Sequence, residues 1–518
     1  MTTLNFKDVL DIPKWRPLSP SMAASLAGNS LINDCRNNID NHCMVYNLRS
    51  AVALDAFDVK NDEWMLIGSP GLTGVFGAGA GGCFMASAGP RGVLAAGWTT
   101  TQGALTTALP AAVGANQLAN RGDKIGFKIR IIGNGAGSSG RTEERYIISN
   151  TLEATPIITL DAPLTFTPVA GDGFEILSGR VYMLSAGVLA AGMWRHYDVA
   201  TNSFSGNLAT AGLTATIGTN SSFVAMDELY VPHNRLPGEG FFGNLTSTAI
   251  AASSITGHAT GGDATVLANE YRNFQIRIVQ DTTNRTAVGQ RRIIASHTAG
   301  ASPVYTLQAA WTVNPSVGAV YVIENPNYIL RWGDASANTF TYAWMAIGGM
   351  VADTWNTTQF GARGGVTGAG VTSAQSFGII PDVQKNARHS HIHSFRGAAG
   401  TVLDILDIAG GATGTWLNTA VHRGTATAFG AGTSGDYDGA TNGGRYMYLN
   451  VNGLQRFLRY DLQNRVIEPW TFLRFVQGVA VVGKKMSGAL FVDGATKTYL
   501  PITQQHTGSN MFQLIAQR

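Results

Sequence analysis

A segment of 50 residues occurs twice in this chain, and the two copies align without a gap at an offset of 147 positions. Residues 127–176 begin FKIRIIGN, residues 274–323 begin FQIRIVQD, and 17 of the 50 aligned positions are identical. An internal repeat of this kind indicates that the chain is assembled from copied units. Copied β units build surfaces and scaffolds more readily than one asymmetric catalytic centre, so the repeat favours a structural role.

Each copy has the pattern of a small antiparallel β unit. Apolar and polar residues alternate over residues 127–131, which predicts a strand with one buried face. Residues 145–148 and the run that ends at residue 160 predict a second and a third strand, and the second copy repeats this pattern. One such unit buries little apolar surface, so we expect it to pack on the rest of the chain or on a neighbouring subunit.

The composition indicates an all-β protein with many tight turns. The chain has 63 Gly and 17 Pro and is 45% apolar, and it lacks convincing amphipathic helices. Charged residues make up 13%, about half of the usual quarter. A surface so poor in charge suits extensive burial in an assembly. The alternative is a Gly/Thr-rich soluble β protein.

Several function classes lack support. The net charge is +3 without a basic stripe, so sequence-specific nucleic-acid binding is not expected. The first residues lack the pattern of a signal peptide, and no run of about 18 apolar residues predicts a membrane segment. Cys35, Cys43 and Cys83 lack metal-ligand spacing, and we expect reduced thiols.

A second, weaker repeat predicts β-hairpins. Phe57-Asp58 is followed by Asn61 and then by Trp64. Asp and Asn hydrogen-bond their own backbone and reverse the chain, and the two aromatic residues pack across the resulting strand pair. The pattern recurs as Tyr197-Asp198…Asn202…Phe204, Asp334…Asn338…Phe340, Tyr460-Asp461…Asn464…Trp470 and, without the Asn, as Asp407…Trp416.

This hairpin pattern is similar to that of the kelch type of β-propeller blade. The resemblance implies four-stranded blades, about five or six of them, although the double Gly of kelch blades is only partly present, with residues 348–349 and 410–411 as its candidates. The fold class is therefore predicted as all-β, a kelch-like β-propeller with two duplicated small antiparallel β insertions. Generic hairpins in a β-sandwich are the alternative.

The hairpin pattern and the duplicated segment together divide the chain into an N-terminal arm and alternating blade and insertion regions. One short helix is expected near residues 22–31. The expected regions are 1–43 (arm), 44–94 (first blade region), 95–178 (first insertion), 179–235 (blade region), 236–325 (second insertion) and 326–518 (remaining blades and C-terminal closure).

The arrangement IRI…G.G…R.I.S.T…TL…A.T..P resembles a segment that recurs in structural proteins of tailed bacteriophages, and propellers also occur in the tail nozzles of short-tailed phages. The resemblance implies an oligomeric virion protein of the tail or neck that is made and assembled in the host cytoplasm. It further implies contacts with other virion proteins and a ring of copies around the DNA channel.

Three alternatives stay open. A glycan-binding adhesin or receptor-binding protein would use exposed aromatic platforms, a head-decorating protein would use the same interfaces elsewhere on the virion, and a propeller hydrolase would need a pair of carboxylates in a central pocket. The candidate aromatic platforms are Trp98, Trp194, Trp332, Trp344 and Trp355.

The candidate site residues are His389, His391 and His393. In a strand these imidazoles share one face and could bind a metal if another strand or subunit adds ligands. A polar strand at a surface or an interface is the favoured interpretation. The chain has no G-x-S-x-G motif, and the Gly-rich residues 135–140 lack the helix and Lys-Ser/Thr of a phosphate loop. We therefore expect neither an enzyme nor a cofactor.

Overall fold

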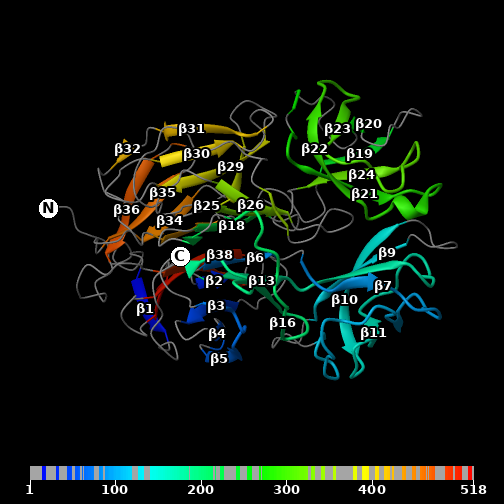
Figure 1. Cartoon of the computed structure of the whole chain (residues 1–518), viewed down its shortest axis with the longest axis horizontal. Helices are drawn as coiled ribbons and strands as arrows, with labels where there is room; N and C mark the ends of the chain where they lie inside the picture. The colour runs from blue at the N-terminus through cyan, green and yellow to red at the C-terminus, as the bar shows by residue number, and fades with distance from the viewer. Residues whose placement is uncertain are drawn as a thin grey trace, which may run out of the picture.

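The computed structural model consists of β-strands and one short 3-10 helix in its described part (Figure 1). The prediction of an all-β chain is confirmed. The structure describes residues 14–18, 31–33, 44–49, 53–58, 61, 63–74, 81–85, 88–119, 126–133, 141–185, 187–213, 216–217, 222–226, 241–245, 254–259, 268–269, 271–324, 328–332, 340–344, 354–356, 377–381, 388–395, 403–407, 413–420, 423–424, 434–438, 446–450, 456–461, 464, 466–472, 485–493, 496–504 and 511–515.

Most strands outside the duplicated segments form six sheets, which we number in chain order: five antiparallel sheets of four strands and one sheet of five strands with a parallel edge strand. Sheet 1 is β2 (Leu31–Asn33), β3 (Met44–Arg49), β4 (Ala53–Asp58) and β5 (Glu63–Gly68); sheet 2 is β6 (Gly81–Met85), β13 (Arg180–Leu184), β15 (Trp194–Asp198) and β16 (Ser203–Phe204); sheet 3 is β18 (Ser222–Met226), β25 (Tyr328–Trp332), β26 (Phe340–Trp344) and β27 (Thr354–Asn356).

Sheet 4 is β28 (Phe377–Pro381), β29 (Arg388–Phe395), β30 (Leu403–Asp407) and β31 (Thr415–Ala420); sheet 5 is β33 (Ser434–Asp438), β34 (Tyr446–Asn450), β35 (Arg456–Asp461) and β36 (Val466–Phe472), with the short parallel strand β32 (Arg423–Gly424) beside β36; sheet 6 is β37 (Lys485–Asp493), β38 (Thr496–Gln504), β39 (Met511–Ile515) and β1 (Lys14–Leu18). A separate two-stranded pair is β14 (Gly187–Val188) and β17 (Thr216–Ile217).

The first strands of neighbouring sheets contact one another. Strand β2 contacts β6 and β37, strand β18 contacts β6 and β28, and strand β33 contacts β37. Sheet 6 is completed by β1, which pairs antiparallel with β39, so the two ends of the chain share one sheet. Residues 1–43, expected as an arm, thus supply one strand to sheet 6 and one to sheet 1. Leu31, expected at the end of a helix, begins β2, and residues 22–30 lie outside the described part.

Neighbouring sheets pack through aromatic and aliphatic side chains. Tyr46 of sheet 1 lies over Tyr197 of sheet 2 with ring centroids 6.0 Å apart, and both belong to one buried cluster. Trp194 of sheet 2 lies 5.1 Å from Trp355 of sheet 3 in a second cluster. These contacts bury both faces of sheet 2, which explains why four of the five residues of β13 are buried and only Arg180 is partly exposed.

The hairpin chemistry expected from the weaker repeat is present. At the end of β4, the backbone N–H of Asn61 donates to Asp58 Oδ1 at 3.1 Å and its side-chain amide donates to Oδ2 at 2.8 Å. Phe57 pairs with Trp64 across β4 and β5, with ring centroids 5.1 Å apart. The turn and the aromatic pair therefore form one local unit.

The other hairpins follow this plan in part. Asn464 makes the same two bonds to Asp461, and Tyr197 lies 5.3 Å from Phe204. Tyr460, however, pairs with Ile467 and not with Trp470, because β36 begins earlier than the aromatic spacing indicated. Residues 334 and 338 lie outside the described part.

The duplicated segments form two further β units beside the sheets (Figure 1). Module 1 is a six-stranded sheet of β7 (Arg91–Val93), β8 (Gln102–Ala104), β9 (Lys128–Ile132), β10 (Thr142–Asn150), β11 (Ile157–Leu160) and β12 (Gly173–Leu177). Module 2 is a closed barrel of β19 (Phe241–Leu245), β20 (Ser254–Ala259), β21 (Gln275–Gln280), β22 (Arg291–His297), β23 (Val304–Leu307) and β24 (Val320–Glu324), with a 3-10 helix η1 (Arg285–Ala287).

The two modules have the same strand order and, apart from a register shift between Ile278 and Gln280 in module 2, the same registers. Ile129 pairs with Ile176 and, at the offset of 147, Ile276 pairs with Ile323. A β-bulge follows Ile147 in β10 and the equivalent residue in β22. The end strands β7 and β8 of module 1 are joined by an isolated bridge between residues 94 and 105, so its sheet also curls around a core.

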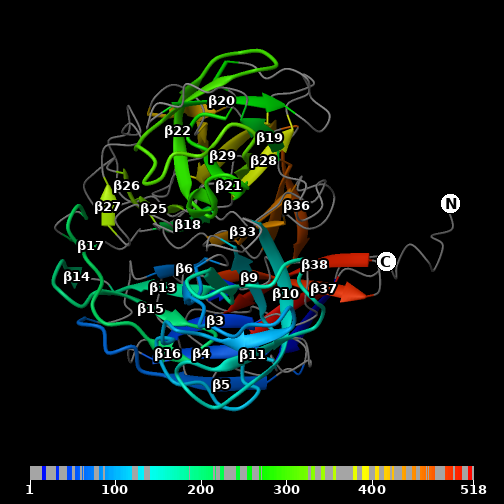
Figure 2. The same cartoon turned by 90° about the vertical axis from the view of Figure 1, so that its right-hand side faces the viewer.

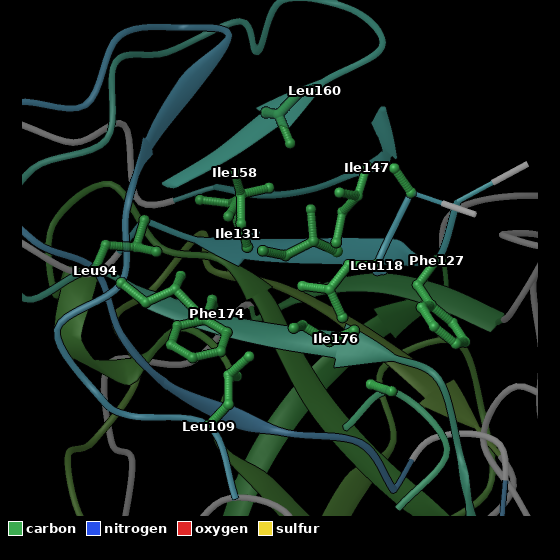
Figure 3. Close-up of a cluster of buried hydrophobic side chains, with 14 of the residues drawn as sticks. Leu94, Leu109, Leu118, Phe127, Ile131, Ile147, Ile158, Leu160, Phe174 and Ile176 are labelled. Carbon is green, nitrogen blue, oxygen red and sulfur yellow. The ribbon is translucent and has the colours of Figure 1, made fainter. Parts of the chain in front are cut away.

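That core is drawn in Figure 3. Apolar residues of β9, β10, β11 and β12 converge with Leu94, Leu109 and Leu118 from the connecting segments. The inward positions are those that alternate in the sequence, and the polar positions between them point outward. Within the described residues, no helix has the length and hydropathy needed to cross a membrane.

Candidate functional site

The two modules contact each other, and this contact is the candidate functional site (Figures 1 and 2). Arg141, next to β10, forms an isolated antiparallel bridge with Gln280 at the end of β21. On the other side, Ile132 at the end of β9 faces Gly289, where an added Cβ would lie 3.1 Å from Ile132 Cγ2. Each module therefore offers the same β9–β10 or β21–β22 region to the other.

A row of charged side chains crosses the outer face of module 1. The registers place Glu175 of β12 beside Arg130 of β9, and Arg130 beside Glu144 of β10. Arg130 donates from Nη1 to Glu175 Oε2 and from Nε to Glu144 Oε1, each at 3.0 Å. Arg130 is 2% exposed although it points away from its own core, because module 2 covers this face.

Module 2 completes the network with Arg291. Its Nη1 and Nη2 donate to Glu175 Oε1 and Oε2, both at 2.9 Å, in a bidentate pair whose side chains are 3% and 8% exposed. Glu175 thus binds guanidinium groups of both modules. Removal of one member of a buried pair leaves the other charge uncompensated and costs about 3–5 kcal/mol.

The pKa of Glu144 also depends on charged residues of both modules. Burial by itself raises the pKa of Glu144, but Arg130, Lys128 and Arg277 together hold that pKa below its usual value. Arg277 belongs to module 2 and is bonded through Nε to Glu324 Oε2 at 3.1 Å. The interface therefore contains ionised carboxylates on module 1 and guanidinium groups on both sides.

Module 1 is also attached to sheet 2. Gln117 Nε2 donates to the carbonyl oxygen of Ala200 at 2.8 Å, and Ala200 belongs to the hydrophobic core of module 1. Ala200 lies in the turn between β15 and β16, which Asp198 holds by accepting from Thr201 N at 3.2 Å. The β15–β16 turn of sheet 2 therefore also packs against the core of module 1.

The structure shows one further pair of equivalent residues that precedes the duplicated segment and that the gapless alignment does not match. Asn116 and Asn269 both have positive φ, 58° and 62°, and both accept from the backbone N–H of an equivalent strand residue, Asn150 and His297. Both residues belong to an Ala-Asn dipeptide, at 115–116 and 268–269. An alignment that allows a gap between this dipeptide and the duplicated segment would match the two.

The candidate metal ligands lie on β29, the second strand of sheet 4. The register places His391 opposite Gly378 on one side and Asp407 on the other, a carboxylate that the sequence did not place there. The side chains of His389, His391 and His393 lie outside the described part. Among the side chains that the structure does describe, no group of three or more His, Cys, Asp or Glu could hold a metal ion.

Three of the candidate glycan platforms are buried. Trp98 is 4% exposed in the core of module 1, and Trp194 and Trp355 are 1% and 4% exposed between sheets 2 and 3. The side chains of Trp332 and Trp344 lie outside the described part. The buried indoles are packing residues and offer no surface to a sugar.

Comparisons with known proteins supply little. No protein family matches the chain, and no curated protein does. Among solved structures, a mutant of NanB sialidase from Streptococcus pneumoniae is 7% identical, with 96% of this chain and 94% of that chain covered, at a TM-score of 0.22. A likeness this weak carries no argument about fold or activity.

Proposed function

We propose that this chain is a structural component of a tailed-phage virion, an oligomeric tail or neck protein that acts through subunit interfaces. The observation that carries the proposal is the pair of modules. A duplicated β unit is joined to its twin by a buried ion pair and stands beside the sheets, where it can meet neighbouring subunits (Figure 1). The virion setting rests on the resemblance of the duplicated segment to tailed-phage structural proteins.

We further propose that the six sheets are the blades of a kelch-like β-propeller. Antiparallel sheets of mostly four strands, the contacts of β2 with β6 and β37, of β18 with β6 and β28 and of β33 with β37, and a last sheet built from strands near residues 14 and 515 support this assignment. The pairing of β1 with β39 would join the first and last parts of the chain into one closed ring. Six blades agree with the upper end of the range expected from the hairpin pattern.

The role would be mechanical and not enzymatic. Buried polar side chains of the modules are engaged in structural bonds: Asn150 Oδ1 accepts from Leu118 N at 2.8 Å, and Asp281 Oδ2 accepts from Ser316 N at 2.7 Å. Such groups hold loops in place, and the Asp281 carboxylate is engaged in these structural bonds. Antiparallel sheets joined in this way resist deformation, as a ring under load requires.

Native mass spectrometry and projection images of the purified protein test the proposal. We expect one defined oligomer with a closed, ring-like projection, and a protein–protein contact of well over ~1,000 Å² per subunit pair. An antibody against the chain should label the tail or neck of particles that carry it. A protein that stays monomeric at micromolar concentration, or label on the head alone, would contradict the assignment.

A further inference from the structure

The contact between the modules is nearly symmetric. The end of β9 (Ile132) faces the start of β22 (Gly289), and the start of β10 (Arg141) faces the end of β21 (Gln280). At the offset of 147, these are reciprocal contacts between equivalent regions. Two copies of one unit that meet through the same patch form an isologous contact, the type made by a two-fold dimer.

The charged rows that meet in this contact have diverged. In module 1 the row across β12, β9 and β10 is Glu175, Arg130 and Glu144. The equivalent row across β24, β21 and β22 of module 2 is Val322, Arg277 and Arg291. The central arginine is the same in both modules. Module 2 has Val322 in place of the carboxylate of Glu175, and Arg291 in place of the carboxylate of Glu144.

The divergence decides which modules can pair. In a two-fold contact, the residue at the β12 position of one module meets the residue at the β10 position of its partner, as Glu175 meets Arg291. Two copies of module 1 would place Glu175 against Glu144, twice. Two copies of module 2 would place Val322 against Arg291, twice, and would bury a guanidinium without a carboxylate.

We propose that this face is an interaction surface that accepts a module of the opposite type and rejects a module of its own type. Only the unlike pair places a carboxylate against the buried guanidinium of Arg291, and a buried charge without a partner is strongly unfavourable. Rejection of the like pair is specificity obtained from repulsion as well as attraction. The partner of each module is therefore the other module, and the surface would not join two chains through identical modules.

A disulfide reporter in the full-length chain measures the pairing. Residues opposite each other in an antiparallel bridge have Cα atoms about 4.5–5.5 Å apart, within the range of a disulfide. In Arg141→Cys/Gln280→Cys we expect rapid formation of an intrachain disulfide under mild oxidation, identified by peptide mass mapping. Hydrogen exchange of β9–β11 and β21–β23 reports at the same time whether each module remains folded.

Row replacement then tests specificity. Arg291→Glu/Val322→Glu gives module 2 the row of module 1, and Glu144→Arg/Glu175→Val gives module 1 the row of module 2. Each should slow formation of the reporter disulfide at least about tenfold while the modules stay protected. The combination of all four changes exchanges the rows, moves the ion pair to residues 144 and 322, and should restore the rate.

Two outcomes would overturn the proposal. One is a normal disulfide rate in either single-row variant; the other is no recovery in the four-fold variant although both modules stay folded. If that variant loses its protected core, Glu175→Gln and Arg291→Gln decide, because they retain shape. Each must slow the disulfide, and the double change must slow it by less than the product of the two single effects; a full product would contradict a coupled pair.

Discussion

Arg292 of module 2 and its equivalent Arg145 of module 1 make the same two backbone bonds but differ in burial and in their remaining partner, since Arg145 also forms an ion pair with Glu143. Each guanidinium donates through Nε to the carbonyl oxygen of an equivalent loop residue, Ala310 at 2.7 Å and Pro163 at 3.2 Å. Each also donates through Nη1 to the carbonyl of the residue before it. Arg292 is 2% exposed and lies 5.2 Å from the ring centroid of Trp311, whereas the Arg145 side chain is 21% exposed.

The structure sets the expected magnitude. Arg292 donates three bonds, to two carbonyls and to Thr312 Oγ1 at 3.1 Å, and a bond from a charged donor contributes about 1.5–3 kcal/mol. Arg292→Met also removes the cost of burying the guanidinium, so the expected loss is about 3–5 kcal/mol. In Arg145→Met, water can replace part of the lost bonds, and the expected loss is about 1–2 kcal/mol.

Hydrogen exchange followed by mass spectrometry measures both effects in one protein. Peptides over residues 304–315 should lose protection in Arg292→Met, and those over 157–168 should lose far less in Arg145→Met. The local readout is needed because a chain with several sheets and modules need not unfold in one step. Equal losses, or a larger loss in module 1, would refute the reasoning that burial determines the contribution of this arginine.

Three further predictions follow from single positions. Gly289 and Gly318 have φ of +85° and +86°, but only Gly289 has an atom of module 1 within 4 Å of an added Cβ. Gly289→Ala should therefore lower the free energy of unfolding by about 1 kcal/mol more than Gly318→Ala, measured as the larger drop in melting temperature. Burial lowers the pKa of His196 to about 3 from 6.5, so the unfolded chain takes up a proton first and stability should fall as pH drops from about 6.5 toward 3; urea unfolding of His196→Phe should show a flatter pH profile. Asp461→Ala removes both bonds from Asn464 and should destabilise sheet 5 by about 1–2 kcal/mol in chemical denaturation, with no effect on protection of the modules.

The features that could be expected from sequence are local ones. Alternation over residues 127–131 predicts the strand β9 because the period of two follows from strand geometry, and the structure buries Ile129 and Ile131 as that pattern requires. The bonds between Asn61 and Asp58 follow from side chains that reach their own backbone. In both cases the interacting residues are close in the chain, so composition and spacing determine the contact.

Contacts between distant segments could not be anticipated in this way. Nothing near residues 14–18 indicates a pairing with Met511–Ile515, and nothing near Glu175 indicates an arginine 116 positions away. The burial of Arg130 could not be anticipated for the same reason, because an outward position on a strand is polar in sequence whether water or a second module covers it. Likewise, the register that sets Asp407 opposite His391 depends on hairpin geometry that spacing does not determine.

The repeat nevertheless contains information about the contact, because the two copies differ in a structured way. Positions that hold one module together are kept, such as Ile129 with Ile276 and Arg145 with Arg292, and they lie in the core or bond a loop. At the outer face, Glu144 has become an arginine in module 2, and this arginine is the one that binds the carboxylate of module 1. If that face were exposed to water, either charge would serve equally well in both copies. A charge reversal placed at the buried contact is instead what a contact between two unlike modules requires.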